Sequence, residues 1–154
     1  MFKLQTHLAR MMTAGSRATQ EARAAVEQLD ALSAKASGSL ADSVKALDKK
    51  IGAVLDGSGE PAGAATKEKN LKDMNADIYS LYMAVDRADA APTAAQVKAT
   101  DTTEPDLAGA LKRWDEIKSS DLPALNRSLK GANLPEIHLE SNHHDEEDTD
   151  GDEE

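Results

Sequence analysis

Acidic side chains near the carboxyl end of the sequence are spaced partly like a calcium-binding loop. Glu146, Asp148 and Asp150 alternate with other residues before Gly151, and this spacing lets oxygen atoms wrap around an ion while glycine permits the turn. The bidentate acid that closes such a loop follows about six residues after the glycine, but Glu154 follows after only three. We therefore expect weak, non-selective cation binding and no specific calcium site.

Histidines could supply ligands for a transition metal at the same end of the chain. His138, His143 and His144 lie close together in the sequence. Adjacent histidines on an unstructured segment lack the outer hydrogen bonds that orient metal ligands. We expect no specific metal site from these residues, and His7 near the amino end has no evident nucleophilic partner.

Residues 57–62 read Gly-Ser-Gly-Glu-Pro-Ala and fit the glycine pattern of dinucleotide-binding proteins. Such a site needs a strand before the glycines and a helix amino terminus directly after them, which holds the pyrophosphate. Pro61 and Gly63 follow instead, and residues 51–55 keep helical spacing. We expect no nucleotide cofactor.

Many carboxylates are present, but none accompanies a signal for a buried pocket in which paired acids could transfer protons. Trp114, Tyr79 and Tyr82 fall on or beside apolar stripes, and their spacing indicates core side chains. The sequence therefore predicts no catalytic, cofactor-binding or metal-binding residue, and a protein that is not an enzyme.

The charge of the chain is concentrated in its carboxyl end. Of the 28 acids, nine lie from Glu140 onward, where there is no lysine or arginine. Residues 1–139 are left with 19 acids against 18 bases, a net charge of −1. No basic stripe is available to replace phosphate counterions, so DNA and RNA are not expected partners. No apolar run reaches the roughly 20 residues of a membrane span, and the start lacks the apolar core of a signal peptide.

Composition favours helix throughout the chain. Aromatic residues make up 3% of the sequence, and cysteine is absent, which excludes disulfides and thiolate metal sites. Apolar residues recur at steps of three and four in four long segments. These stripes predict helices at residues 2–36, 40–55, 66–88 and from Thr93 onward.

Start and stop signals refine these helices. Ser39, with Asp42 three residues later, is a plausible cap for the second helix, and Thr93 with Gln96 matches a capping box. Pro105 and its Thr-rich neighbours predict a break or kink before Trp114, because proline lacks an N–H group and clashes with the preceding turn. A last short helix should begin at residues 121–123 and end at Lys130, with Gly131 as the left-handed residue beyond it.

Together these elements predict an all-α, antiparallel four-helix up-and-down bundle with a short extra carboxyl-terminal helix. The bundle should span residues 1–137. Residues 138–154 should form a disordered tail that is acidic and contains histidines, because no apolar side chain after Leu139 can anchor it.

Three stretches resemble the carboxyl-terminal helical region of bacterial sortilin-type BNR/YVTN-repeat β-propeller proteins, often described as glycosyl hydrolase-like or photosystem II assembly factor-like. The first reads LYMAVDRADAAPTAAQ at residues 81–96 and is followed by Trp114. The others read SDLPALN at residues 120–126 and ANLPEI at residues 132–137. The resemblance is specific in order and spacing over about residues 71–137, and looser over residues 1–56.

The resemblance implies a helical region that follows a β-propeller. The propeller blades, which would carry any ligand site, are absent from this sequence, so no functional residue of the family can be assigned here. We expect a non-catalytic structural or protein-interaction module whose partner is a β-propeller domain of the same or a neighbouring chain. The alternative is a free-standing helical protein whose acidic tail binds cations or basic partners. The oligomeric state stays open, and an extracytoplasmic location is implied by the resemblance alone.

Overall fold

The chain forms a bundle of helices in the computed structural model, which describes residues 2–58, 69–88 and 90–139. Its helices are, in chain order, α1 (Phe2–Ser33), α2 (Ser39–Leu55), α3 (Leu71–Asp86), α4 (Ala94–Glu116), a π-helical turn η1 (Ile117–Asp121) and α5 (Leu122–Gly131). No strand occurs among the described residues. The predicted all-α antiparallel bundle with a short final helix is confirmed.

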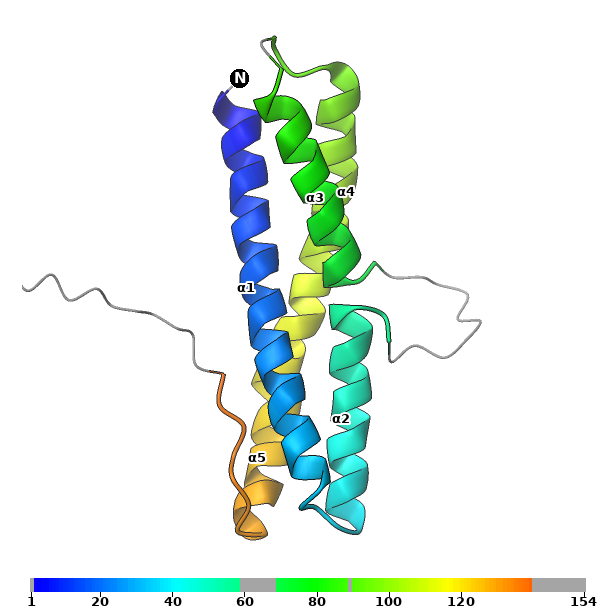
Figure 1. The fold of residues 1–154 in the computed structure, drawn as a ribbon, viewed down its shortest axis with the longest axis vertical. Coiled ribbons are helices and arrows are strands. Elements are labelled where there is room, and N and C mark those ends of the chain that lie inside the picture. Colours follow the sequence, from blue (N-terminus) through cyan, green and yellow to red (C-terminus); the bar gives the residue numbers. More distant parts are fainter. Residues whose placement is uncertain (1, 59–68, 89, 140–154) are drawn as a thin grey trace, which may run out of the picture.

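The helices form three long rods (Figure 1). One rod is α1, and a second is the continuous run of α4, η1 and α5, which descends beside it. The third rod consists of α2 and α3, which lie end to end and point in the same direction. The all-α bundle is as predicted, but its helices do not alternate up and down as predicted, because α3 continues in the direction of α2. Helix lengths explain this arrangement: α1 has 32 residues, whereas α2 has 17 and α3 has 16. At about 1.5 Å per residue, two such helices in tandem are needed to cover the apolar stripe of α1.

The stripe of α1 is continuous and narrow. Its buried members are spaced by three or four residues from Leu8 to Leu32, as the sequence predicts. The middle of the stripe is made of small residues, Gly15, Ala18, Ala22 and Ala25. Small side chains let neighbouring helices approach closely, and a Cβ atom at Gly15 would overlap Oδ1 of Asn75 on α3.

One helix start agrees with the sequence, and two differ from it: α3 begins at Leu71 instead of residue 66, and α2 lacks the predicted cap. Thr93 and Gln96 form the predicted capping box, in which each side chain accepts the other's backbone N–H. Helix α3 begins at Leu71, after Asn70 accepts the N–H of Asp73. The predicted cap at Ser39 is wrong by one residue: Gly38 precedes α2, with a φ of 63° that favours glycine.

The predicted break at Pro105 is wrong, since α4 runs through it. Pro105 is exposed, so the carbonyl group that lost its N–H partner can bind water. The core-facing positions before it are held by Thr100 and Thr103, whose methyl groups extend the stripe of Leu107, Ala110, Trp114 and Ile117. Their hydroxyl groups donate to carbonyl oxygens four residues earlier, which satisfies them inside the bundle.

The end of α5 also differs from the prediction. Gly131 is still helical, and the left-handed residue is Asn133, with a φ of 59°. The N–H of Leu134 donates to the carbonyl of Leu129, and that of Asn133 donates to Lys130. This pair of bonds is a Schellman motif, and it turns the chain back along the bundle.

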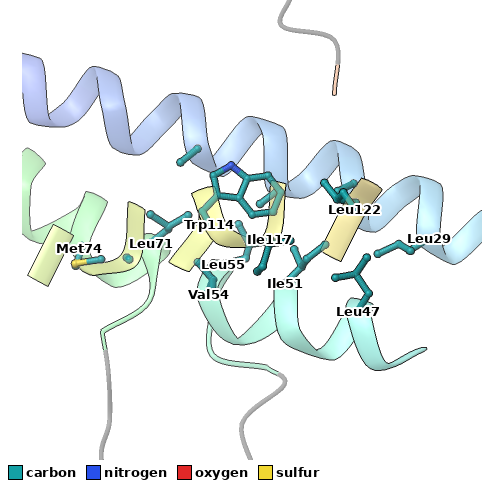
Figure 2. Close-up of a cluster of buried hydrophobic side chains, with 14 of the residues drawn as sticks. Leu29, Leu47, Ile51, Val54, Leu55, Leu71, Met74, Trp114, Ile117 and Leu122 are labelled. Atoms are coloured by element: carbon teal, nitrogen blue, oxygen red, sulfur yellow. The ribbon is translucent and has the colours of Figure 1, made fainter. Parts of the chain in front are cut away.

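Trp114 lies at the level where α2 ends and α3 begins (Figure 2). Its side chain is 1% exposed, which confirms that it belongs to the core. It is grouped there with Leu55 of α2, Leu71 of α3 and Ile117. Tyr79, by contrast, is 54% exposed, so its interpretation as a core residue is wrong. Tyr82 is half-buried and packs against the core.

We predict that Trp114→Ala lowers the free energy of unfolding by about 3 to 5 kcal/mol, because a large cavity opens where the three rods meet. Urea denaturation followed by circular dichroism measures this loss. Tyr79→Ala is the matched control, and should change stability by no more than about 0.5 kcal/mol. Equal effects of the two substitutions would contradict the assigned core.

We predict that Gly15→Ala destabilises the protein by about 1 to 2 kcal/mol, because the new methyl group displaces Asn75 from its hydrogen bond to Thr19. Helix propensity alone would give the opposite sign, a gain of about 1 kcal/mol. Gly109→Ala, where a Cβ meets nothing within 4 Å, should show that gain. The double variant Gly15→Ala with Asn75→Ala should regain much of the free energy of unfolding that Gly15→Ala loses. A Gly15→Ala variant more stable than the wild type would refute the close approach of α1 and α3.

Candidate functional site

A groove of about 690 Å³ runs between α1 and α4. We call it the α1–α4 groove, and its lining residues are Thr6, Ala9, Arg10, Thr13, Ala14, Arg17, Ala18 and Glu21 of α1, Leu111, Trp114 and Asp115 of α4, and Lys118 of η1. The lining residues of α1 form one wall of the groove, because positions three or four residues apart lie on the same face of a helix. Small apolar residues and Leu111 line its floor, and long charged side chains line its edges.

A partly buried polar cluster lies at one end of the groove around the carboxylate of Glu21. Its Oε2 accepts hydrogen bonds from Nε1 of Trp114 at 2.9 Å and from Nζ of Lys118 at 3.0 Å. Its Oε1 lies 3.4 Å from Nε of Arg17, and the Glu21 side chain is only 12% exposed. The indole N–H of Trp114 would otherwise be buried without an acceptor. The Glu21 carboxylate accepts its hydrogen bond, and the negative charge strengthens that bond.

The protonation of Glu21 follows from these contacts. Desolvation by burial raises its pKa, but the hydrogen bonds from Trp114 and Lys118, together with the charges of Lys118 and Arg17, outweigh that effect. The net result is a pKa lowered from the ordinary value. Glu21 is thus held as a carboxylate, and it fixes two cations at the edge of the groove.

The amino-terminal part of α1 is positively charged along the groove. Lys3, Arg10 and Arg17 recur every seven residues, and no acid occurs before Glu21. Lys3, Thr6, His7 and Arg10 line a second hollow of about 470 Å³ that shares two residues with the groove. His7 lies 3.2 Å from Glu104 of α4. Lys3 and Arg10 make no hydrogen bond or ion pair with any residue in the part of the chain that the structure describes.

Beyond the cluster, the chain's own carboxyl-terminal segment lies against α1 and α5. After the turn at Asn133, the segment 134–139 runs back beside α5 and α1 (Figure 1). Asn126 of α5 makes two hydrogen bonds to the backbone of Ile137. Gln28 of α1 makes two to the backbone of His138. Ile137 is buried, and Leu134 and Leu139 pack against the core.

The structure does not bring together the histidines and glycines that the sequence offered as candidate ligand-binding residues. His138 exposes its side chain and is held through its backbone, while His143, His144 and the calcium-like acids lie outside the described residues. Gly57 lies two residues beyond the end of α2 with a φ of 79°, and residues 51–55 before it are helical. The strand needed for a dinucleotide site is therefore not formed there.

Within residues 2–58, 69–88 and 90–139, no cluster of three or more histidines and acids could hold a metal ion. No helix in those ranges is long and apolar enough to cross a membrane. The Glu21 cluster was missed by sequence reasoning, because its contacts join residues 93 and 97 positions apart.

We predict that acid destabilises the wild-type protein more than a Glu21→Gln variant. A lowered pKa means that the Glu21 carboxylate stabilises the fold above the unfolded value of about 4.3. That contribution is lost as pH falls through the lower folded value. At pH 7 the variant should lose about 1 kcal/mol, because its amide still accepts from Trp114 but leaves the cations unpaired.

Thermal melts at about pH 7, 5 and 3 test this sign, because they cover the acid range in which a carboxyl group with a lowered pKa becomes protonated. Glu27→Gln, on an exposed part of α1, is the control. If Glu21→Gln and wild type lose the same stability between pH 5 and 3, Glu21 is not the charged anchor described above.

The resemblance to sortilin-type proteins rests on the residues quoted for it, because comparison with known proteins adds no relative. The stretches at residues 81–96, 120–126 and 132–137 contribute the α3–α4 connection with its capping box, the passage into α5 and the returning segment. They are therefore residues that shape the fold. Neither models of known protein families, nor curated proteins, nor solved structures show a significant match to this chain.

Proposed function

We propose that this chain is a non-catalytic protein-interaction module. Its α1–α4 groove would receive a segment of a sortilin-type BNR-repeat β-propeller, in the same chain or a neighbouring one. The observation that carries the proposal is the groove itself. It leaves a long face of a three-rod bundle open, with a floor of Ala9, Ala14 and Leu111 between charged edges.

The shape of the groove favours a protein segment over a small ligand. A small-molecule site usually encloses most of its ligand among apolar side chains with a few fixed polar groups. This groove is an elongated surface feature whose α1 wall extends from Thr6 to Glu21, about 23 Å at the helical rise. A helix or extended strand of a partner would cover that length and complete a four-rod bundle.

The partner follows from the resemblance, which implies a helical region after a β-propeller. The residues that carry the resemblance include those that build the α3–α4 turn and the end of the second rod, and Trp114, which lines the groove. Arg10 lines the α1 side of the groove, and this cation favours an acidic group in the partner segment.

Calorimetric titration of the chain with a purified sortilin-type β-propeller tests the proposal. Thr13→Trp should weaken binding about tenfold or more, a loss of about 1.4 kcal/mol, because Thr13 is exposed, lines the groove, and a bulky ring would fill it.

Thr102→Trp is the matched control. Thr102 is also exposed, lies outside the groove, and its hydroxyl makes the same bond to the carbonyl four residues earlier. It should leave the affinity unchanged. Absence of measurable binding, or equal losses in both variants, would contradict the proposal. Loss of binding only when the chain is cut after Leu139 would favour the acidic-tail alternative instead.

A further inference from the structure

We infer that the acidic segment 140–154 docks along the α1–α4 groove of its own chain, over the cations of α1. The inference joins three observations: where the described chain ends, what lies ahead of that point, and how the charges are distributed. It concerns an intramolecular contact, so it stands without the propeller partner. Where such a partner uses the groove, the segment and the partner compete for it.

The first observation is the position of Leu139. Gln28, which grips His138, lies on the same face of α1 as Glu21 and Arg17, because steps of four, three and four residues connect positions 17, 21, 24 and 28. The returning segment thus covers the continuation of the groove wall. Four hydrogen bonds and the buried Ile137 fix it there.

The second observation is direction and length. The returning segment runs toward the amino-terminal end of α1 (Figure 1), and therefore toward the open groove. From Gln28 to Lys3 is 25 residues of helix, about 37 Å. The 15 residues from Glu140 onward can extend about 50 Å at about 3.3 Å per residue. The segment is long enough to follow the whole groove.

The third observation is charge. The segment holds nine acids and no base. The part of α1 that it would pass holds Lys3, Arg10 and Arg17 and no acid before Glu21. Glu21 is already neutralised by Lys118 and Arg17, while Lys3 and Arg10 pair with no described residue. The segment has no apolar side chain, so docking would depend on charge and would weaken with salt.

A single spin label tests the inference, because the native chain contains no cysteine. Asp148→Cys, carrying a nitroxide, lies nine residues beyond Leu139. Nine extended residues span about 30 Å, close to the roughly 27 Å of helix between Gln28 and Arg10. Docking should therefore broaden the amide resonances of Thr6 to Thr13 in the full-length, ¹⁵N-labelled chain. At 1 M salt, where the Debye length falls from about 10 Å to about 3 Å, the broadening should drop at least about twofold.

Lys3→Glu with Arg10→Glu should abolish the broadening. The matched control reverses two exposed lysines on α2, Lys45→Glu with Lys49→Glu, and should leave it intact. Circular dichroism checks that both variants fold. Absence of broadening at residues 6–13, or broadening that survives Lys3→Glu with Arg10→Glu, overturns the inference. A second sample mixes the native, cysteine-free chain labelled with ¹⁵N and the spin-labelled chain without ¹⁵N. Broadening of the ¹⁵N-labelled chain in this mixture also overturns the inference, since the contact would then join two copies.

Discussion

The packing of Trp114 at the junction of the three rods is the constraint on which the other features depend. The third rod is interrupted between α2 and α3, and a large side chain from α4 fills that level of the core. Burying an indole leaves its N–H in need of an acceptor, and Glu21 of α1 supplies it. A carboxylate so placed needs cations in turn, and Lys118 and Arg17 provide them. Packing in the core thus determines which charges stand at the edge of the groove.

The small residues of α1 determine how closely the neighbouring helices approach. Gly15, Ala18, Ala22 and Ala25 form the middle of the α1 stripe and bring α1 close to its neighbours over much of its length. Near the carboxyl end, the chain's own returning segment covers α1 and α5 through Ile137 and its hydrogen bonds. Near the amino end no described segment does so, and the α1–α4 groove is open. The open part of this face is therefore confined to the amino-terminal half of α1.

Local and periodic features of this fold could be predicted from the sequence. The stripes of α1 and α2, the capping box at Thr93 and the burial of Trp114 all follow from spacing and side-chain chemistry. The continuity of α4 through Pro105 could not, because it depends on the buried positions of Thr100 and Thr103, which composition presents as polar. The prediction for Tyr79 failed in the opposite direction: spacing beside an apolar stripe indicated a buried side chain, but Tyr79 is exposed.

The end-to-end arrangement of α2 and α3 and the Glu21 cluster lie beyond local patterns. The arrangement of α2 and α3 follows from the lengths of two short helices that together match one long helix. The Glu21 cluster depends on contacts between positions that are distant in the sequence.

The measurement that tests the role of Trp114 most directly is the indole N–H resonance of Trp114, the single tryptophan in the chain. A hydrogen-bonded indole should exchange slowly with water at neutral pH. Its shift should change on acidification as Glu21 is protonated, at a lower pH than for an ordinary glutamate because the pKa of Glu21 is lowered. Exchange at the rate of a free indole, with no shift change on acidification, would contradict the account.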